Sequence, residues 1–288
     1  MTDFLLGTSG YDYPEWKGVF YPADLKRCDF LSYYATQFNA LEVNNTFYNM
    51  PTAERLLSFY ERSEGRLAFS VKANRLLTHE AGRDWKRAAE AFKAALKPLL
   101  EKDRLCAVLF QFPQSFHYTD ENRIYLARLI PEFEGFPVMI EFRHREWIRE
   151  SVFAGLEERG ASLVFCDMPR LSALPVGNAG QTSDSSEMKS PFIGKTAYIR
   201  LHGRNENAWY AKASVQNPGD KNGSERYRYD YSDAELEEFL PVIQSARKAG
   251  KQTMIFFNNH PDGSGAKNAR RLGEMILQSM CQKTFFQK

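Results

Sequence analysis

The chain of 288 residues lacks the features that mark several classes of protein. Its four cysteines, Cys28, Cys106, Cys166 and Cys281, are scattered and form no CxxC pair, which argues against a zinc ribbon and a thiol redox motif. No apolar run approaches the length that crosses a bilayer, and the N-terminus does not have the pattern of a secretory signal. We therefore expect a cytoplasmic protein with reduced cysteines and no membrane contact.

Excess charge and the common catalytic motifs are missing too. A formal net charge of +2 excludes a strongly basic protein held on nucleic acid by bulk electrostatics, although a local basic patch stays open. The sequence has no Walker loop, no GxGxxG, no GxSxG and no HExxH. Function must therefore be sought in the placement of the remaining polar residues.

Eight short β-rich runs are present, and each is followed by a segment with helical periodicity. This alternation predicts a parallel sheet, and eight units predict closure into a (β/α)8 TIM barrel. Gly65, Gly160 and Gly250 stand where helix C-caps are expected, and Ser232 with Glu235 forms a capping box. The predicted strands are Phe4–Thr8, Leu41–Asn45, Leu67–Val71, Leu105–Phe110, Val138–Phe142, Ser162–Cys166, Thr196–Leu201 and Thr253–Phe257, and two of the predicted helices are Asp84–Leu100 and Ser232–Ala249.

Loop lengths indicate which end of the barrel carries function. The joints after strands 1, 6 and 7 are long, covering about residues 10–26, 167–195 and 203–231. Catalytic and binding groups of TIM barrels sit on the face where such loops follow the strands. Residues 1–288 are predicted to form one barrel domain, in which the polar stretch 176–194 is a flexible insertion.

Strand alternation predicts which polar side chains face the barrel interior. In the second strand Leu41 and Val43 are apolar and face the helices, so Glu42 faces inward. A closed salt-bridge network that plugs the barrel competes with a ligand site, and for the deeper Glu42 and Lys72 the two readings are equally open. The inward set is Glu42, Asn44, Lys72, Asn74, Gln111, Glu141, Arg143, Asp167, Arg200, His202, and Asn258 or Asn259.

Rings and imidazoles gather at the same strand ends. All five histidines fall at or just beyond a strand, and so do Trp16, Trp147 and Trp209 together with Tyr11 and Tyr48. Loops are generally rich in such residues, so no single one of them indicates a site. The prediction rests on their joint placement. We expect an aromatic rim around a mixed-charge pocket.

Seven motifs together resemble the YecE-like family of uncharacterised proteins: GTSGYDYPEW, EVNNTFY, FSVKAN, LFQFP, EFRHREW, YIRLHGR and FFNNHPDGSGAKNA. The resemblance runs from about Gly7 to Asn268 and implies a barrel similar in outline to metal-dependent endonucleases and sugar isomerases. The polar stretch after Asp167 departs from the family pattern. Family-like positions are Ser9, Tyr11, Trp16, Glu42, Asn44, Thr46, Tyr48, Lys72, Asn74, Gln111, Pro113, Glu141, Arg143, Trp147, Arg200, His202, Gly203, Asn258 and Asn259.

The preferred hypothesis is a protein that binds or processes an anionic small molecule, bearing phosphate or carboxylate, or a nucleotide-like ligand. Lys72, Arg143 and Arg200 would supply positive charge. Candidate catalytic residues are Glu42, Glu141 and His202. Candidate ligand-binding residues are Ser9, Tyr11, Trp16, Asn44, Tyr48, Lys72, Asn74, Gln111, Arg143, Trp147, Asp167, Arg200, Trp209, Asn258 and Asn259. On this view Arg200→Ala removes ligand binding and leaves the fold largely intact.

Two other functions remain open. The first is a nucleic-acid-binding or endonuclease-like protein that acts on single-stranded or damaged DNA, since aromatics mix with basic residues at the mouth. The second is a metal-dependent hydrolase or isomerase with ligands from Glu42, Glu141, Asp167, His202 and His260, which the neighbouring cations disfavour. We predict no metal site, and a glycosidase is disfavoured because Glu42 and Glu141 come from distant strands. Cofactor, turnover and oligomeric state stay undetermined.

Overall fold

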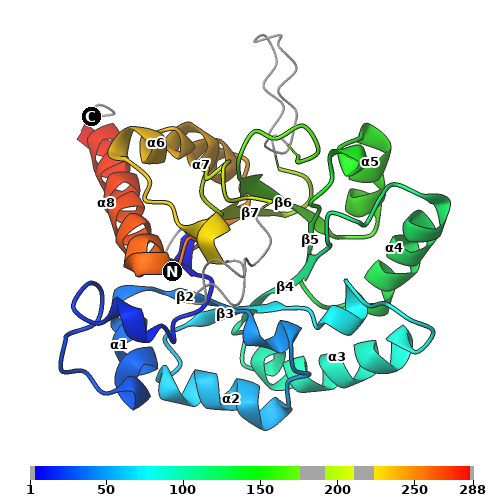
Figure 1. Ribbon diagram of the computed structural model, residues 1–288, viewed down its shortest axis with the longest axis horizontal. Helices are drawn as coiled ribbons and strands as arrows, with labels where there is room; N and C mark the ends of the chain where they lie inside the picture. The colour runs from blue at the N-terminus through cyan, green and yellow to red at the C-terminus, as the bar shows by residue number, and fades with distance from the viewer. Residues whose placement is uncertain (1–3, 176–191, 211–223, 286–288) are drawn as a thin grey trace.

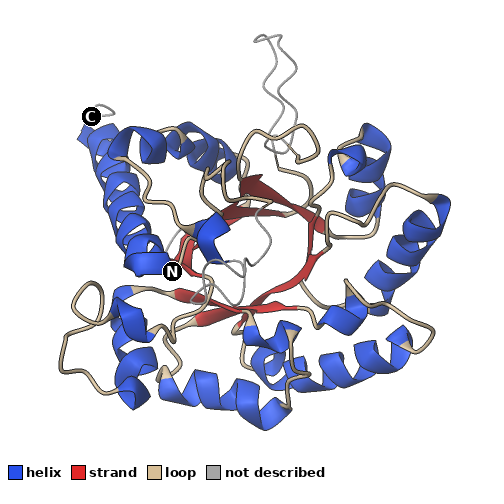
Figure 2. Ribbon diagram, viewed as in Figure 1, coloured by secondary structure: helices blue, strands red, loops and turns tan. Residues whose placement is uncertain are grey.

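Parallel strands form the centre of the molecule, and helices surround them. The computed structural model describes residues 4–175, 192–210 and 224–285. Within them one eight-stranded sheet has the order β1-β8-β7-β6-β5-β4-β3-β2, and each hydrogen-bonded pair is parallel. Figure 1 shows the strands as a ring seen nearly end-on, and Figure 2 shows the helices as a layer outside it. The predicted TIM barrel is confirmed.

The observed strands agree with the predicted ones to within one or two residues at each end. They are β1 (Phe4–Thr8), β2 (Ala40–Val43), β3 (Ala68–Lys72), β4 (Leu105–Gln111), β5 (Val138–Glu141), β6 (Ser162–Asp167), β7 (Thr196–Leu201) and β8 (Gln252–Phe257). The helices are α1 (Phe30–Gln37), α2 (Ala53–Arg62), α3 (Trp85–Glu101), α4 (Asp120–Glu132), α5 (Glu150–Glu158), α6 (Asp233–Glu237), α7 (Phe239–Lys248) and α8 (Ser264–Phe285).

Strand alternation divides the apolar residues into two cores. Leu41, Val43 and Ile199 belong to the core between strands and helices, whereas Met139 and Tyr198 belong to a separate cluster inside the barrel. Side chains therefore fill the barrel below its mouth, as in other TIM barrels. The predicted parity is confirmed for β2, β5 and β7.

The ring closes between β1 and β2 with help from side chains. Among the described residues, backbone hydrogen bonding there is limited to the bridge of Ser9 with Glu42 and a 2.9 Å bond from the Gly10 N–H to the Glu42 carbonyl. Asn39 Oδ1 accepts from the Leu6 N–H at 2.7 Å, and the Tyr34 hydroxyl accepts from the Thr8 N–H at 2.7 Å. Because buried amides need partners, these two side chains replace part of the missing strand ladder.

Predicted helix signals are confirmed, with one correction. Gly65, Gly160 and Gly250 have φ of 68°, 71° and 68°, the left-handed region that glycine adopts at helix ends. The capping box of Ser232 and Glu235 is formed. The segment predicted as one helix, Ser232–Ala249, is two, α6 and α7, because Pro241 has no N–H to bond back across the junction at Glu238.

The predicted flexible insertion, 176–194, lies mostly outside the described residues. Its last three residues are described and belong to the packed body. Phe192 is buried against Phe165, and the carbonyl of Ile193 accepts from the Leu163 N–H at 3.2 Å. Among the described residues, no helix combines the length and apolar character needed to cross a membrane.

Candidate functional site

A cavity of about 540 Å³ lies at the carboxyl ends of the strands, on the face predicted from the loop lengths. Strand ends supply its polar wall: β3 places Lys72 there, β4 Gln111 and β7 Arg200, and the segments after β2, β5 and β8 add more. The full lining is Tyr13, Glu15, Asn44, Phe47, Tyr48, Lys72, Gln111, Arg143, Arg200, Ser224, Tyr227, Asn258 and His260.

The floor of this cavity is a buried chain of alternating charges. Arg200 donates to Glu42 at 2.6 Å and to Glu141 at 2.5 Å, and Arg143 donates to the other oxygen of Glu141 at 2.5 Å. The two carboxylates have no exposed surface, and Arg200 is 1% exposed. Ser9 and Tyr198 donate to Glu42 at 2.6 and 2.7 Å, so each of its two oxygens accepts at least one hydrogen bond. Such complete pairing is what a buried charge requires.

The network fixes the protonation states of its members. Burial alone would raise the pKa of Glu141, but Arg143 and Arg200 outweigh it and hold the pKa well below 4.5. Burial, followed by the charge of Arg143, lowers the pKa of His202 to about 3. His202 Nε2 lies 3.1 Å from an Arg143 nitrogen and 3.5 Å from Glu141 Oε1, and its Nδ1 lies 3.0 Å from the side-chain nitrogen of Asn258. His202 is therefore a neutral, fully buried ring.

Lys72 differs from the two arginines because its partner is neutral. Its Nζ donates to Gln111 Oε1 at 2.8 Å and lies 4.5 Å from the centre of the Phe47 ring. No carboxylate of the described residues forms an ion pair with it. Burial, followed by the positive charge of Arg200, lowers the pKa of Lys72 to about 7. The Nε–H of Arg200 is likewise buried and has no hydrogen-bond partner among the described residues.

Several predicted ligand contacts lie away from this cavity. Trp16 and Trp147 are 0% and 1% exposed, and their indole N–H groups donate to the carbonyls of His260 and Phe116. Trp209 is 4% exposed and packs near His202, while Tyr11 packs on Phe59 outside the barrel. These rings support the walls and do not line the cavity. Of the predicted aromatic residues Tyr48 does line it, with 65% of its surface exposed.

Four predicted polar contacts have structural partners. Ser9 holds Glu42, and Asn74 caps the short helix Arg75–Leu77 and donates to the Thr46 carbonyl at 2.8 Å. Asp167 accepts from Arg204 and Tyr231, and Asn259 donates to the Tyr229 carbonyl. Alternation explains the last two, because Cys166 and Asn258 face the interior and their neighbours Asp167 and Asn259 face outward. The inward placement predicted for Asp167 is therefore wrong.

Other lining residues stand outside the predicted ligand-binding set, although His260 is one of the histidines predicted at the strand ends. Tyr13 stacks on His260 with ring centres 4.8 Å apart, and Tyr227, Phe47 and Glu15 complete the rim. Tyr13 and His260 lie on the loops after β1 and β8, whose strands pair. Comparing the aromatic residues on loops that follow neighbouring strands would have placed these two rings side by side.

The reason given against a glycosidase is also wrong. Glu42 and Glu141 are not distant, since both bind the guanidinium of Arg200. That guanidinium occupies the space in which a sugar would have to lie between two catalytic carboxylates. A buried metal site fits poorly as well, because Glu141, Cys166 and His202 cluster beside Arg143 and Arg200. Burial raises the pKa of the Cys166 thiol well above 9, so its thiolate, the form that binds metals, is disfavoured.

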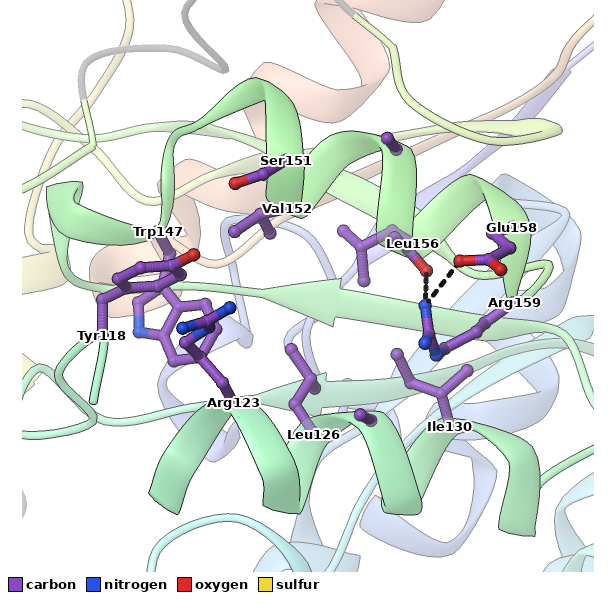
Figure 3. Close-up of a pocket in the computed structure, with 13 residues that line it drawn as sticks. Tyr118, Arg123, Leu126, Ile130, Trp147, Ser151, Val152, Leu156, Glu158 and Arg159 are labelled. Carbon is purple, nitrogen blue, oxygen red and sulfur yellow. Dashed lines mark hydrogen bonds and ion pairs between the residues drawn. The ribbon is translucent and has the colours of Figure 1, made fainter. Parts of the chain in front are cut away.

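A second cavity, of about 520 Å³, lies outside the barrel between α4 and α5. Leu126, Ile130 and Leu156 form its apolar middle, and Arg159 closes one end by donating to Glu158 and to the Gly155 carbonyl (Figure 3). Its charged lining residues lie at opposite ends, Arg123 at one and Arg159 with Glu158 at the other, and do not converge as the groups that fix a ligand do (Figure 3). The cavity at the strand ends is therefore the candidate site.

Comparison with known proteins gives a consistent result. A family model described as "Protein of unknown function DUF72" matches residues 5–285. The UPF0759 protein YunF of Bacillus subtilis (strain 168) is 29% identical over 256 residues, which is 85% of this chain and 86% of YunF. The crystal structure of a DUF72 family protein (TM1631) from Thermotoga maritima superimposes with a TM-score of 0.80 at 31% identity, over 95% of this chain and 99% of that one. A DUF72 family protein (EF0366) from Enterococcus faecalis shares the fold, with a TM-score of 0.77 at 23% identity over 95% of each chain.

Proposed function

The chain belongs to DUF72, a family of proteins of unknown function, and we propose from the geometry of the site that the cavity binds an anionic small molecule bearing a phosphate or carboxylate. The observation that carries the proposal is Lys72, an ammonium on the cavity wall whose polar partner is the neutral Gln111. A bound anion would supply the missing negative charge. The YecE-like name and a cytoplasmic location remain predictions beside this proposal.

The charge around the cavity supports an anionic ligand. Lys72, Arg143 and Arg200 are on its wall, and Glu15 is the one acidic residue among the described residues that line it. Glu42 and Glu141 lie beneath the wall and are already bound to guanidinium groups. Their charges neutralise the two arginines, so Lys72 and Glu15 are the charged side chains of the wall that this network does not pair. The Arg200 Nε–H, which has no hydrogen-bond partner among the described residues, belongs to another residue of the same wall and is a second candidate donor to an anion.

The rim can orient the rest of such a ligand. The amides of Asn44, Gln111 and Asn258 offer donors and acceptors, and the exposed ring of Tyr48 offers a face to a sugar or a base. Polar groups of this kind set orientation in small-molecule sites. The ligand class is therefore a phosphorylated or carboxylated metabolite, including a nucleotide.

Binding is expected to depend on pH because Lys72 titrates near neutrality. Its pKa of about 7 means that the ammonium is charged below that pH and largely neutral above it. Anion affinity should therefore fall as the pH rises through about 7, and binding near that pH should take up a proton. Calorimetry in two buffers with different ionisation enthalpies measures this proton directly.

The test is titration of the protein with inorganic phosphate and with glycerol 3-phosphate. We expect Lys72→Met to lower affinity by about tenfold or more, since a hydrogen bond to a charged group contributes about 1.5–3 kcal/mol. Lys97→Met is the matched control, because Lys97 is exposed on α3 far from the cavity and should leave affinity unchanged. Equal affinity of wild type and Lys72→Met, or of wild type above and below pH 7, would refute the proposal.

Binding of single-stranded or damaged DNA is the second candidate. The exposed ring of Tyr48 beside Lys72 favours it, because stacking on an aromatic residue next to a cation is a common way to hold an unpaired base. The near-zero net charge limits the footprint on a strand. A gel shift with single-stranded and abasic DNA at low salt separates the two candidates, because a metabolite site alone gives no shift.

A further inference from the structure

A second polar cluster lies on the loops after β4 and β5, outside the cavity. It consists of His117, His144 and Glu146. His117 Nδ1 lies 3.3 Å from Glu146 Oε2, and His144 Nδ1 lies 3.4 Å from the same oxygen. The two imidazole rings are 4.5 Å apart at an interplanar angle of 61°. Three atoms that ligate metals in proteins are thus brought to within 4.8 Å of one another.

The spacing matches one face of a tetrahedral metal site. Ligands bound about 2.0–2.1 Å from a zinc ion at tetrahedral angles lie about 3.3 Å from one another. Both histidine-to-carboxylate distances, 3.3 and 3.4 Å, have this length already. The exposed side chain of His117, at 53%, can turn to shorten the remaining distance between the two imidazole nitrogens. We propose that His117, His144 and Glu146 bind one divalent transition-metal ion of the zinc type.

The surroundings hold the ligands in place. Glu146 Oε2 also accepts from the Tyr118 N–H at 3.2 Å, and the Glu146 N–H donates to His144 Nδ1 at 3.4 Å. Because that nitrogen accepts, it carries a lone pair and no proton, and the long bond is one that a metal ion can replace. The nearby cations Arg145 and Arg149 donate to the carbonyls of Ser172 and Glu146, so their guanidinium groups have partners other than the Glu146 carboxylate.

The exposure of the three side chains indicates which class of metal site they can form. His144 is the most buried of the three, at 13%, and Glu146 and His117 are half-exposed. A metal held by three side chains on this surface keeps a fourth position open to water. Three protein ligands with an open position are typical of catalytic and of exchangeable zinc sites, whereas structural sites are closed by four.

The experiment uses the full chain without a histidine tag, stripped with chelator and dialysed. Titration calorimetry with zinc chloride should show one ion per chain, and cobalt chloride should give the visible absorption of a four-coordinate ion. His117→Ala and His144→Ala should each weaken zinc binding by about tenfold or more, with the cobalt band lost. These changes lie in exposed loops, so circular dichroism should remain that of the wild type.

Two controls separate this site from other zinc-binding groups. His79→Ala removes an exposed histidine on another loop, and Cys28→Ser removes an exposed thiol. Neither should change stoichiometry or affinity. The proposal is overturned if the stripped wild type binds no zinc, or if the binding survives both histidine substitutions at the cluster. Phosphate binding at the cavity is measured separately and does not depend on this outcome.

Discussion

Arg200 is the residue on which the floor of the cavity depends. Its guanidinium joins Glu42 from β2 to Glu141 from β5, and all three side chains are almost completely buried. The sequence reasoning expected Arg200→Ala to spare the fold because a mouth residue matters little to the core. The structure argues otherwise, because removing this guanidinium leaves the buried Glu42 without its ion pair and Glu141 with Arg143 alone.

We therefore predict that Arg200→Met lowers the free energy of unfolding by about 3–5 kcal/mol, the usual result of leaving a buried charge without its partner. Urea unfolding followed by circular dichroism measures the change. The control is Arg271→Met, which removes an exposed ion pair with Asp233 and should cost about 1 kcal/mol or less. Equal losses in the two variants would show that the buried network contributes nothing to stability.

His202 makes the free energy of unfolding depend on pH, and a substitution of this residue can measure its contribution separately. Its pKa is about 3 in the folded chain, below the ordinary value of 6.5, because burial and Arg143 oppose its charge. The unfolded chain therefore binds more protons between these values, so the stability that His202 contributes is present above pH 6.5 and is lost as the pH falls. The loss is at most about 1.4 kcal/mol per pH unit.

We expect the unfolding free energy of His202→Gln to be flatter than that of the wild type between pH 6.5 and 4.5. Below that range Glu141 contributes in both proteins, since its pKa is depressed and its stabilisation disappears as it is protonated. Urea denaturation at several pH values supplies the curves. Parallel curves across this range would mean that His202 carries no such linkage.

Gly7 on β1 shows how the elements constrain one another. A methyl group at Gly7 would lie 2.0 Å from the Ala40 carbonyl oxygen and 2.8 Å from the Tyr34 hydroxyl. Both atoms belong to the junction of β1 with β2 and neither is the end of a flexible chain. Only a glycine lets the two strands approach this closely.

Gly7→Ala should consequently destabilise the protein by about 3 kcal/mol or more, because overpacking at a rigid contact shifts the backbone. Gly82→Ala is the matched control, since the added methyl group would lie 4.0 Å from the Glu80 carbonyl oxygen, in ordinary van der Waals contact. Thermal unfolding of both variants provides the comparison. A melting temperature of Gly7→Ala equal to that of the control would show that β1 and β2 separate without cost.

Element boundaries followed from the sequence where local signals act, and failed where tertiary context decides. Glycine caps and the capping box of Ser232 are local, and the structure contains them. The break at Glu238 follows from Pro241, which was overlooked inside a periodic pattern. The orientation of Asp167 could not be read from the alternation of β6, because the four residues before it, Leu163–Cys166, are all apolar and do not mark one face.

For the whole molecule, the repeat of strand and helix was enough to predict the barrel and its functional end. It also predicted that Glu42, Glu141, Arg143 and Arg200 meet. Residues two positions apart on a strand face the same side, and this rule placed all four side chains inside the barrel, where they bind one another. It could not predict which of them reach the cavity. That depends on the height of the Arg200 guanidinium along the barrel axis. This height follows from the stagger of all eight strands relative to one another.

The side-chain junction between β1 and β2 has a mechanical consequence. Between β1 and β8 a ladder of main-chain bonds joins five consecutive residues. Between β1 and β2 the Tyr34 hydroxyl and the Asn39 carboxamide hold the strands together in its place. Under mechanical force we expect the barrel to open between β1 and β2 before β1 separates from β8, and to become a curved sheet in which the first strand is still paired with the last.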